Sequence, residues 1–147
     1  MKFRSLHEEG GQKSFALVFE TGDEVISGLT EFAKDKDLDA ASFTAIGAFG
    51  AATLGYFDLE KKEYDKIPIH EQVEVLSLAG NITIEEDGGP QVHAHVVVGR
   101  YDGTTRGGHL LEARVRPTLE AVLTESPEHL RRKTDEETGL PLIAIEE

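Results

Sequence analysis

Residues 92–99 read Val-His-Ala-His-Val-Val-Val-Gly, and this run of β-branched residues is typical of a β-strand. Successive side chains of a strand point to opposite faces of the sheet. One face would be apolar, with Val92, Ala94, Val96 and Val98. The opposite face would carry His93, His95 and Val97. The stretch therefore predicts a strand that faces a hydrophobic core on one side and presents two imidazoles on the other.

Comparable β-like runs, separated by turn-forming residues, account for most of the chain on both sides of this strand. An opening hairpin is expected from Lys2–Leu6 and Ser14–Phe19. The later predicted strands are Ala41–Phe49, Ala52–Asp58, Glu63–His70, Val73–Ile84, Val92–Gly99 and His109–Thr124. Because no helical pattern separates these later strands, we expect them to pair antiparallel.

One helical pattern lies between the hairpin and the later strands. Apolar residues fall at helical spacing over Gly22–Lys36, and Thr21 stands three residues before Glu24, as in a capping box. Near the end of the chain we expect a short helical turn at Glu128–Arg131 and an edge strand within Leu140–Ile145. Together these elements predict an α+β fold, with one long helix packed on a mostly antiparallel sheet.

The composition limits the possible classes of function. A chain of 147 residues fits one domain of ordinary size, so we expect a single domain over residues 1–147. Its 28 acidic and 15 basic residues give a net charge of −13, so the basic footprint of a nucleic-acid-binding protein is missing. The lack of cysteine excludes disulfides, thiolate metal sites and a cysteine nucleophile. No apolar run is long enough for a membrane span, and we expect a cytoplasmic protein.

Three histidines lie close together in the sequence. Between His95 and His109 the chain has room to end one strand, turn at Asp102-Gly103 and return beside itself. The third imidazole would then join His93 and His95 on one face, and Gly107-Gly108 would allow backbone or a ligand to approach closely. Three neutral imidazoles without a fourth protein ligand are typical of a zinc site with an open position. His93, His95 and His109 are therefore the predicted metal ligands.

The alternative is that the His-x-His pair belongs to a solvated strand surface and binds nothing. The remaining histidines lack partners at a useful spacing and are expected on the surface; they are His7, His70 and His129. Some carboxylates could assist a metal ion, although the sequence alone does not place them near the histidines; they are Glu74, Glu85 and Glu112.

Two further motifs are better explained by structure than by ligand binding. The glycine-rich stretch Gly47–Gly50 is not followed by Gly-Lys-Ser/Thr, so close packing of strands explains it better than a phosphate loop does. The basic run Arg131-Arg132-Lys133 is flanked by carboxylates and is expected to form a solvated face.

Three segments, in this order and spacing, resemble the plants and prokaryotes conserved domain, known as PPC. They are Glu74–Ile82, His93-Ala94-His95 and Gly107–Leu110. With the glycine-rich stretch Gly47–Gly50, the resemblance extends from about Ser14 to Thr124.

The resemblance implies an α+β fold with a largely antiparallel sheet, assembled as a homotrimer. The PPC fold is also similar to that of α-acetolactate decarboxylase, which holds zinc with three histidines, two of them in a His-x-His arrangement. The resemblance thus implies a zinc-binding role for His93, His95 and His109.

In plants the PPC domain follows an AT-hook in nuclear DNA-binding proteins, whereas this chain resembles the free-standing prokaryotic members. Plant sequences have Gly-Arg-Phe where this chain has Glu71-Gln72-Val73, and Arg114-Val115-Arg116-Pro117 lacks the glycine of an AT-hook core. Three hypotheses remain: a trimeric metal-binding domain that binds or acts on a small molecule, a DNA-associated regulatory protein, and a non-catalytic assembly module.

Overall fold

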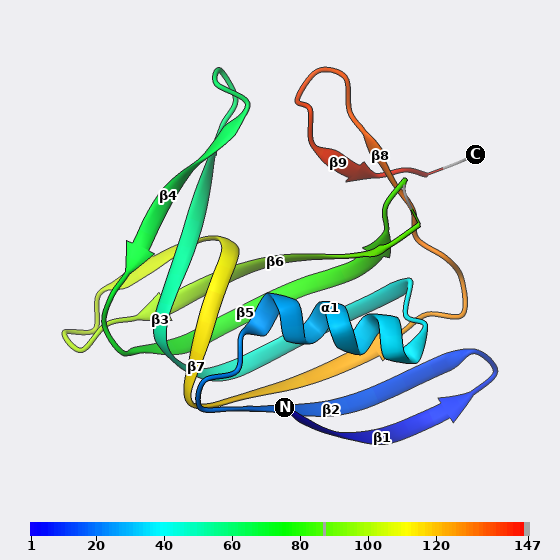
Figure 1. Ribbon diagram of the computed structural model, residues 1–147, viewed down its shortest axis with the longest axis horizontal. Coiled ribbons are helices and arrows are strands. Elements are labelled where there is room, and N and C mark those ends of the chain that lie inside the picture. Colours follow the sequence, from blue (N-terminus) through cyan, green and yellow to red (C-terminus); the bar gives the residue numbers. More distant parts are fainter. Residues whose placement is uncertain (87, 146–147) are drawn as a thin grey trace.

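A computed structural model describes residues 1–86 and 88–145 of the chain. Its elements, in chain order, are β1 (Lys2–Glu9), β2 (Gln12–Glu20), α1 (Val25–Lys36), β3 (Ala40–Asp58), β4 (Glu63–Ile69), β5 (Val73–Ile84), β6 (Pro90–Gly99), β7 (Thr105–Glu125), β8 (Arg132–Thr134) and β9 (Pro141–Ile143). The first seven strands form one sheet in the order β1-β2-β7-β6-β5-β3-β4, and a further pairing of β7 with β3 closes four of them into a ring (Figure 1). All pairings are antiparallel, which confirms the predicted mostly antiparallel α+β fold.

Helix α1 is shorter than the long helix that the sequence predicts. It has 12 residues and begins after Glu24, whose carboxylate accepts hydrogen bonds from two backbone N–H groups of the first turn. The predicted start at Gly22 and the predicted capping role of Thr21 are therefore wrong. Gly22 has a φ of 95° in the preceding turn, and the Thr21 hydroxyl donates to the carbonyl of Pro117 on β7. A helix of this length and composition does not cross a membrane, and the described residues contain no other helix.

The hydrophobic core lies between α1 and the sheet. The helix buries one apolar stripe, formed by Val25, Leu29, Phe32 and Ala33. Large side chains from the inner face of the sheet, such as Phe19, Phe49 and Leu119, are fully buried against it. Because burial of apolar surface is the main favourable term in folding, this interface holds the helix on the sheet.

Two strands run on where the sequence predicts interruptions. The predicted strands Ala41–Phe49 and Ala52–Asp58 are one strand, β3, and the predicted break near Pro117 lies inside β7. Irregularities in the β3–β7 register near Gly47 and Phe49 bend the strands without ending them. The bent strands carry the β3–β4 hairpin beyond the main body of the sheet (Figure 1).

The C-terminal segment differs most from the prediction. Residues 128–131 are not helical, and the backbone N–H of Leu130 donates to the carbonyl of Asp39. The predicted edge strand within Leu140–Ile145 is only Pro141–Ile143, and it pairs with β8 in a separate two-stranded sheet instead of the main one. In Figure 1 this β8–β9 hairpin rises opposite the β3–β4 hairpin, on the other side of a gap.

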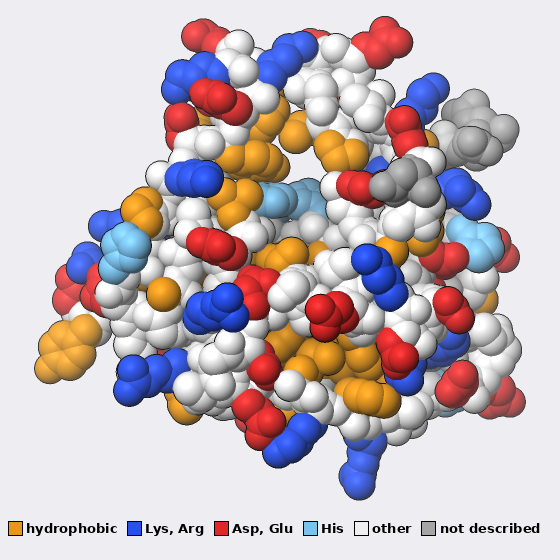
Figure 2. Space-filling model, viewed as in Figure 1, with side chains coloured by type: hydrophobic (Ala, Val, Ile, Leu, Met, Phe, Trp, Pro, Cys, Tyr) orange, Lys and Arg blue, Asp and Glu red, His pale blue; other side chains and the backbone are white. Residues whose placement is uncertain are grey.

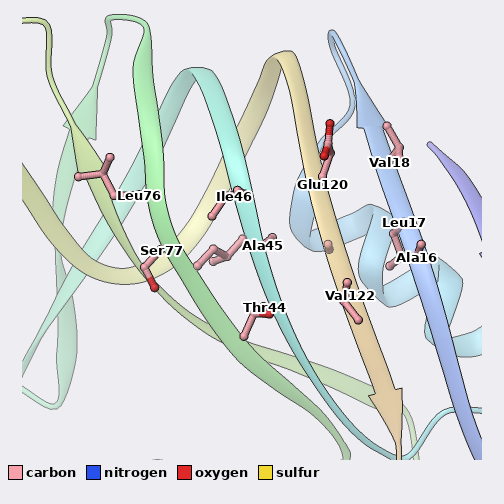
Figure 3. Close-up of a pocket in the computed structure, with 12 residues that line it drawn as sticks. Ala16, Leu17, Val18, Thr44, Ala45, Ile46, Leu76, Ser77, Glu120 and Val122 are labelled. Carbon is pink, nitrogen blue, oxygen red and sulfur yellow. The ribbon is translucent and has the colours of Figure 1, made fainter.

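The sheet face opposite α1 is apolar and exposed. Its large side chains are Val18 on β2, Ile46 on β3, Leu76 on β5 and Val122 on β7, each between 38% and 62% exposed. They surround a shallow hollow of about 480 Å³ (Figure 3). We call this surface the open face.

Candidate metal centre

Strand β6 places two imidazoles on one face, as the alternation predicts. Ala94, Val96 and Val98 are buried in the core, whereas His93 is half-buried and His95 is exposed on the opposite side. The rings of His93 and His95 lie with their centroids 5.0 Å apart. The predicted orientation of the strand is therefore confirmed.

Strand β7 brings the third imidazole to the same place. His109 is the direct cross-strand partner of His95, and Gly55 of β3 pairs with His109 from the other side. A Cβ atom at Gly108 would lie 2.7 Å from the carbonyl oxygen of Gly55, and one at Gly107 would lie 3.1 Å from that of Val96. The two glycines thus let β3, β6 and β7 lie close together. The sequence predicts that backbone or a ligand approaches them, and the structure shows that it is backbone.

The three rings form one compact cluster. The centroid of His109 lies 5.0 Å from that of His93 and 5.4 Å from that of His95, and one ring nitrogen of each histidine lies within 4.8 Å of the others. The Nε2 atoms of His93 and His95 are 3.2 Å apart. Two imidazoles on one tetrahedral zinc ion, each bound at about 2.0 to 2.1 Å, would have their nitrogens roughly 3.3 Å apart. The His93–His95 pair already has the separation of two ligands of one ion.

Burial keeps the imidazoles of His93 and His109 in the form that binds metals. It lowers the pKa of His109 to about 4, with the neighbouring His93 and His95 as further causes. Burial is also the largest cause that lowers the pKa of His93, and the positive charge of Arg132 is the second. Both rings are therefore neutral at pH 7, and neutral imidazole is the form that donates a lone pair to a metal ion.

Tyr64 on β4 holds the ring of His109, and the sequence gives no signal for it. The two ring centroids lie 4.7 Å apart, and the Tyr64 hydroxyl lies 3.4 Å from Nδ1 of His109. A hydroxyl oxygen accepts the Nδ1 proton that a histidine keeps when it binds a metal ion through Nε2. Tyr64 can therefore orient His109 for ligation.

Arg132 on β8 contacts a second member of the cluster, His93. Only 6% of its surface is exposed, so the predicted solvated face is wrong for this residue, although Arg131 and Lys133 are exposed as expected. The guanidinium reaches Nδ1 of His93 at 3.2 Å. The sequence could not place Arg132 here, because its contacts with Asn81 and Thr83 join residues about 50 positions apart in the chain.

A cavity of about 160 Å³ opens beside the cluster. His93, His109, Tyr64 and Arg132 line it together with Gln91, Val92 and residues 140–142. It lies between the β3–β4 and β8–β9 hairpins, where Figure 2 shows pale blue histidine side chains at the bottom of the hollow between two projections. The candidate ligands therefore adjoin a space that a small molecule could enter.

The other candidate residues lie elsewhere. The three histidines are the only group of potential ligand atoms found together in residues 1–86 and 88–145, so Glu74, Glu85 and Glu112 do not join it. The Glu112 carboxylate accepts a hydrogen bond from the Thr53 hydroxyl instead. His7, His70 and His129 are exposed, and His129 contacts the carboxylate of Asp39.

Solved structures with the same fold are known from archaea and bacteria. A plant- and prokaryote-conserved (PPC) protein of Pyrococcus horikoshii is 32% identical, with a TM-score of 0.85 over 99% of this chain and 96% of its own. A metal-containing protein of Archaeoglobus fulgidus is 41% identical, with a TM-score of 0.82 over 90% of this chain and 94% of its own. A "putative DNA-binding protein" of Ralstonia eutropha is 30% identical, with a TM-score of 0.86 over 97% of this chain and 96% of its own.

Sequence comparison agrees with the structural likeness. The bifunctional protein GlmU of a Synechococcus strain is 31% identical over 140 residues, which are 93% of this chain and 21% of that protein. The chain thus spans about a fifth of the length of this curated relative. The family model of the Plants and Prokaryotes Conserved domain matches residues 6–127. This chain belongs to that domain family.

Proposed function

We propose that this chain is a metal-binding PPC-domain protein that holds one zinc ion through His93, His95 and His109. The observation that carries the proposal is the 3.2 Å separation of the His93 and His95 Nε2 atoms, with a nitrogen of His109 within 4.8 Å. An all-imidazole set suits zinc among the common divalent ions, whereas Mg²⁺ and Ca²⁺ prefer oxygen ligands. The metal-containing relative from Archaeoglobus fulgidus supports a metal in this family.

The metal content of untagged protein tests the proposal. We expect about one zinc ion per chain after incubation with zinc and removal of the excess, because all three ligands come from one chain. Protein that takes up less than roughly a tenth of an ion per chain, a level below that of any specific site of this kind, would contradict it.

The cavity supports a role in binding or acting on a small molecule. Three protein ligands leave one position of a tetrahedral ion open, and such a position polarises a bound group or activates water. The cavity beside the histidines gives access to that position. A non-catalytic assembly module is the alternative, and a substrate screen without turnover at full zinc occupancy would favour it.

The open face supports assembly as a homotrimer. Monomeric proteins rarely expose a contiguous apolar surface of this kind. A row of direct cross-strand partners connects the open face with the metal centre. From β2 to β6 the row consists of Ala16, Val122, Thr44, Ala79 and His95. A second copy of the chain that covered the open face would thus lie close to the metal centre.

Replacing Ile46 by aspartate is expected to convert the assembly to monomers. Ile46 is 62% exposed on the open face, and a carboxylate there would be buried without a partner in any interface. Light scattering should give about three times the chain mass of 16.1 kDa for the unaltered protein and about 16.1 kDa for the variant. Leu59→Asp, at an equally exposed position in the turn between β3 and β4, should leave the mass unchanged. A monomeric unaltered protein would contradict the trimer.

A DNA-associated function is the second candidate, because the Ralstonia eutropha relative carries that description. The net charge of −13 opposes it, since affinity for DNA comes mostly from basic side chains that release counterions at phosphates. Arg114 and Arg116 lie within β7 on either side of the buried Val115, and Arg114 donates to the carbonyl of Gly22. They form no flexible hook that could enter a groove.

Binding to duplex DNA is therefore expected to be undetectable at micromolar protein. A fluorescence anisotropy titration at about 150 mM salt, near physiological ionic strength, checks this expectation. Sub-micromolar affinity that falls steeply as the salt concentration rises would instead support the DNA-associated function.

A further inference from the structure

Among the described residues 1–86 and 88–145, no carboxylate forms an ion pair with the buried guanidinium of Arg132. It donates hydrogen bonds to Thr83 Oγ1 at 2.8 Å, Asn81 Oδ1 at 2.8 Å, the Pro141 carbonyl and His93 Nδ1 at 3.2 Å. All four acceptors are uncharged. Buried arginines normally face a carboxylate, because an unpaired charge is costly to remove from water.

The surrounding charges do not balance this cation. No ion pair of Arg132 lies within 4 Å among the residues that the structure describes. Glu85 attracts the guanidinium electrostatically from a second hollow, which Arg132 lines together with Glu85 and Glu86, although neither carboxylate lies within 4 Å of it. In the part of the chain that the structure describes, no acidic residue lines the cavity beside the histidines. A divalent ion on the histidines would make this cavity more positive still.

The contact between Arg132 and His93 can be released. A guanidinium only donates, so Nδ1 of a neutral His93 accepts and its proton resides on Nε2, which faces Nε2 of His95. A metal ion bound at Nε2 of His93 requires the proton on Nδ1 instead, where it would point at another donor. The Arg132 donor then loses its acceptor, and the cavity next to it is where a new acceptor can lie.

We propose that Arg132 is the anion-binding residue of this cavity, and that the ligand is a small aliphatic carboxylate. The proposal deepens the proposed metal-site function and rests on it for the choice of cavity. A planar guanidinium holds a carboxylate through two parallel hydrogen bonds. The apolar residues Leu140 and Leu142 in the lining suit a short hydrocarbon chain. At about 160 Å³ the cavity is smaller than the roughly 300 to 1,000 Å³ of sites for drug-sized ligands, so the ligand is small.

An NMR titration with butyrate tests the proposal, because it detects millimolar binding and does not depend on activity. Butyrate is expected to shift the side-chain Hε signal of Arg132 in zinc-loaded protein. The shift should need more butyrate in metal-free protein, because Nδ1 of His93 still occupies one guanidinium donor there. Butyramide, which has the same shape without charge, should bind at least about tenfold more weakly, as expected for the loss of charge-assisted hydrogen bonds.

Variants at two adjacent arginines separate a binding role from a structural one. Arg132→Gln should weaken butyrate binding at least about tenfold, the equivalent of one charge-assisted hydrogen bond. Arg131→Gln removes the same charge from an exposed neighbour and should leave binding unchanged. If Arg132→Gln unfolds, Arg132→Lys keeps the charge without the planar fork and should still weaken binding at least about threefold.

The outcomes distinguish this proposal from the metal proposal. Zinc uptake without butyrate binding, or butyrate binding that is equal in the folded Arg132 variants and the unaltered protein, would overturn the role of Arg132 alone. Tighter binding of inorganic phosphate than of butyrate would overturn the carboxylate assignment. Butyrate binding that depends on Arg132 in a protein that takes up no zinc would support the anion site and contradict the metal centre.

Discussion

Replacing any one of His93, His95 and His109 by alanine is expected to lower zinc affinity at least about tenfold. Loss of a residue that only orients a metal ligand already costs about 10- to 100-fold in affinity, and loss of the ligand itself removes a direct bond. One ring nitrogen of each of the three histidines lies within 4.8 Å of the others, so no single imidazole is peripheral. Competition titrations with a chromophoric zinc chelator measure the effect.

The fold should survive these three exchanges. His95 is exposed and the other two imidazoles are half-buried, whereas the apolar face of β6 remains intact in each variant. The matched control is His7→Ala, which removes an exposed histidine of β1 and should leave zinc affinity unchanged. Unchanged affinity in all three site variants would refute the ligand assignment.

Replacing Gly47 by alanine is expected to destabilise the chain by about 3 kcal/mol or more. A Cβ atom at Gly47 would lie 2.3 Å from the carbonyl oxygen of Thr118 and 2.7 Å from Cα of Leu119, both of them backbone atoms that cannot simply rotate away. Overpacking typically costs about 1 to 3 kcal/mol and a disfavoured backbone conformation costs a similar amount. Alanine at position 47 would meet both costs, because its Cβ would overlap backbone atoms of β7 and because the φ of 151° is disfavoured for a residue with a side chain.

Urea denaturation of Gly47→Ala beside Gly103→Ala separates these two costs. Gly103 also has a positive φ, of 78°, but apart from its two chain neighbours no described residue has an atom within 4 Å of the position of its Cβ. Its exchange should therefore cost only about 1 to 2 kcal/mol. Equal destabilisation of the two variants would show that strand packing does not explain Gly47. A larger loss at Gly47 would support the packing explanation of the glycine-rich stretch.

The sequence predicts the parts of the site that depend on local pattern. Alternation along residues 92–98 is enough to place His93 and His95 together, because a strand that covers a core fixes which face each residue occupies. The return of His109 follows from a turn of suitable composition between two β-like runs, and its pairing with His95 confirms it. These inferences need no knowledge of distant segments.

The sequence does not predict the parts that depend on distant contacts. Tyr64 reaches His109 only because β3 pairs with β4 on one side and with β7 on the other, and Gly55 between them has no side chain. Arg132 looks like part of a solvated basic run, yet β8–β9 folds over the sheet and turns it toward Asn81 and Thr83. The same limit explains the wrong helix start. The Glu24 carboxylate is fixed in part by the backbone N–H of Ala113, which is 89 residues away.

A crystal structure of zinc-loaded protein, with anomalous diffraction recorded above and below the zinc absorption edge, tests the central claim most directly. We predict one anomalous peak per chain, about 2.0 to 2.1 Å from a ring nitrogen of each of His93, His95 and His109. The peak should be present above the edge and nearly absent below it. An imidazole cluster without a peak, in crystals of protein that had been offered zinc, would contradict the account.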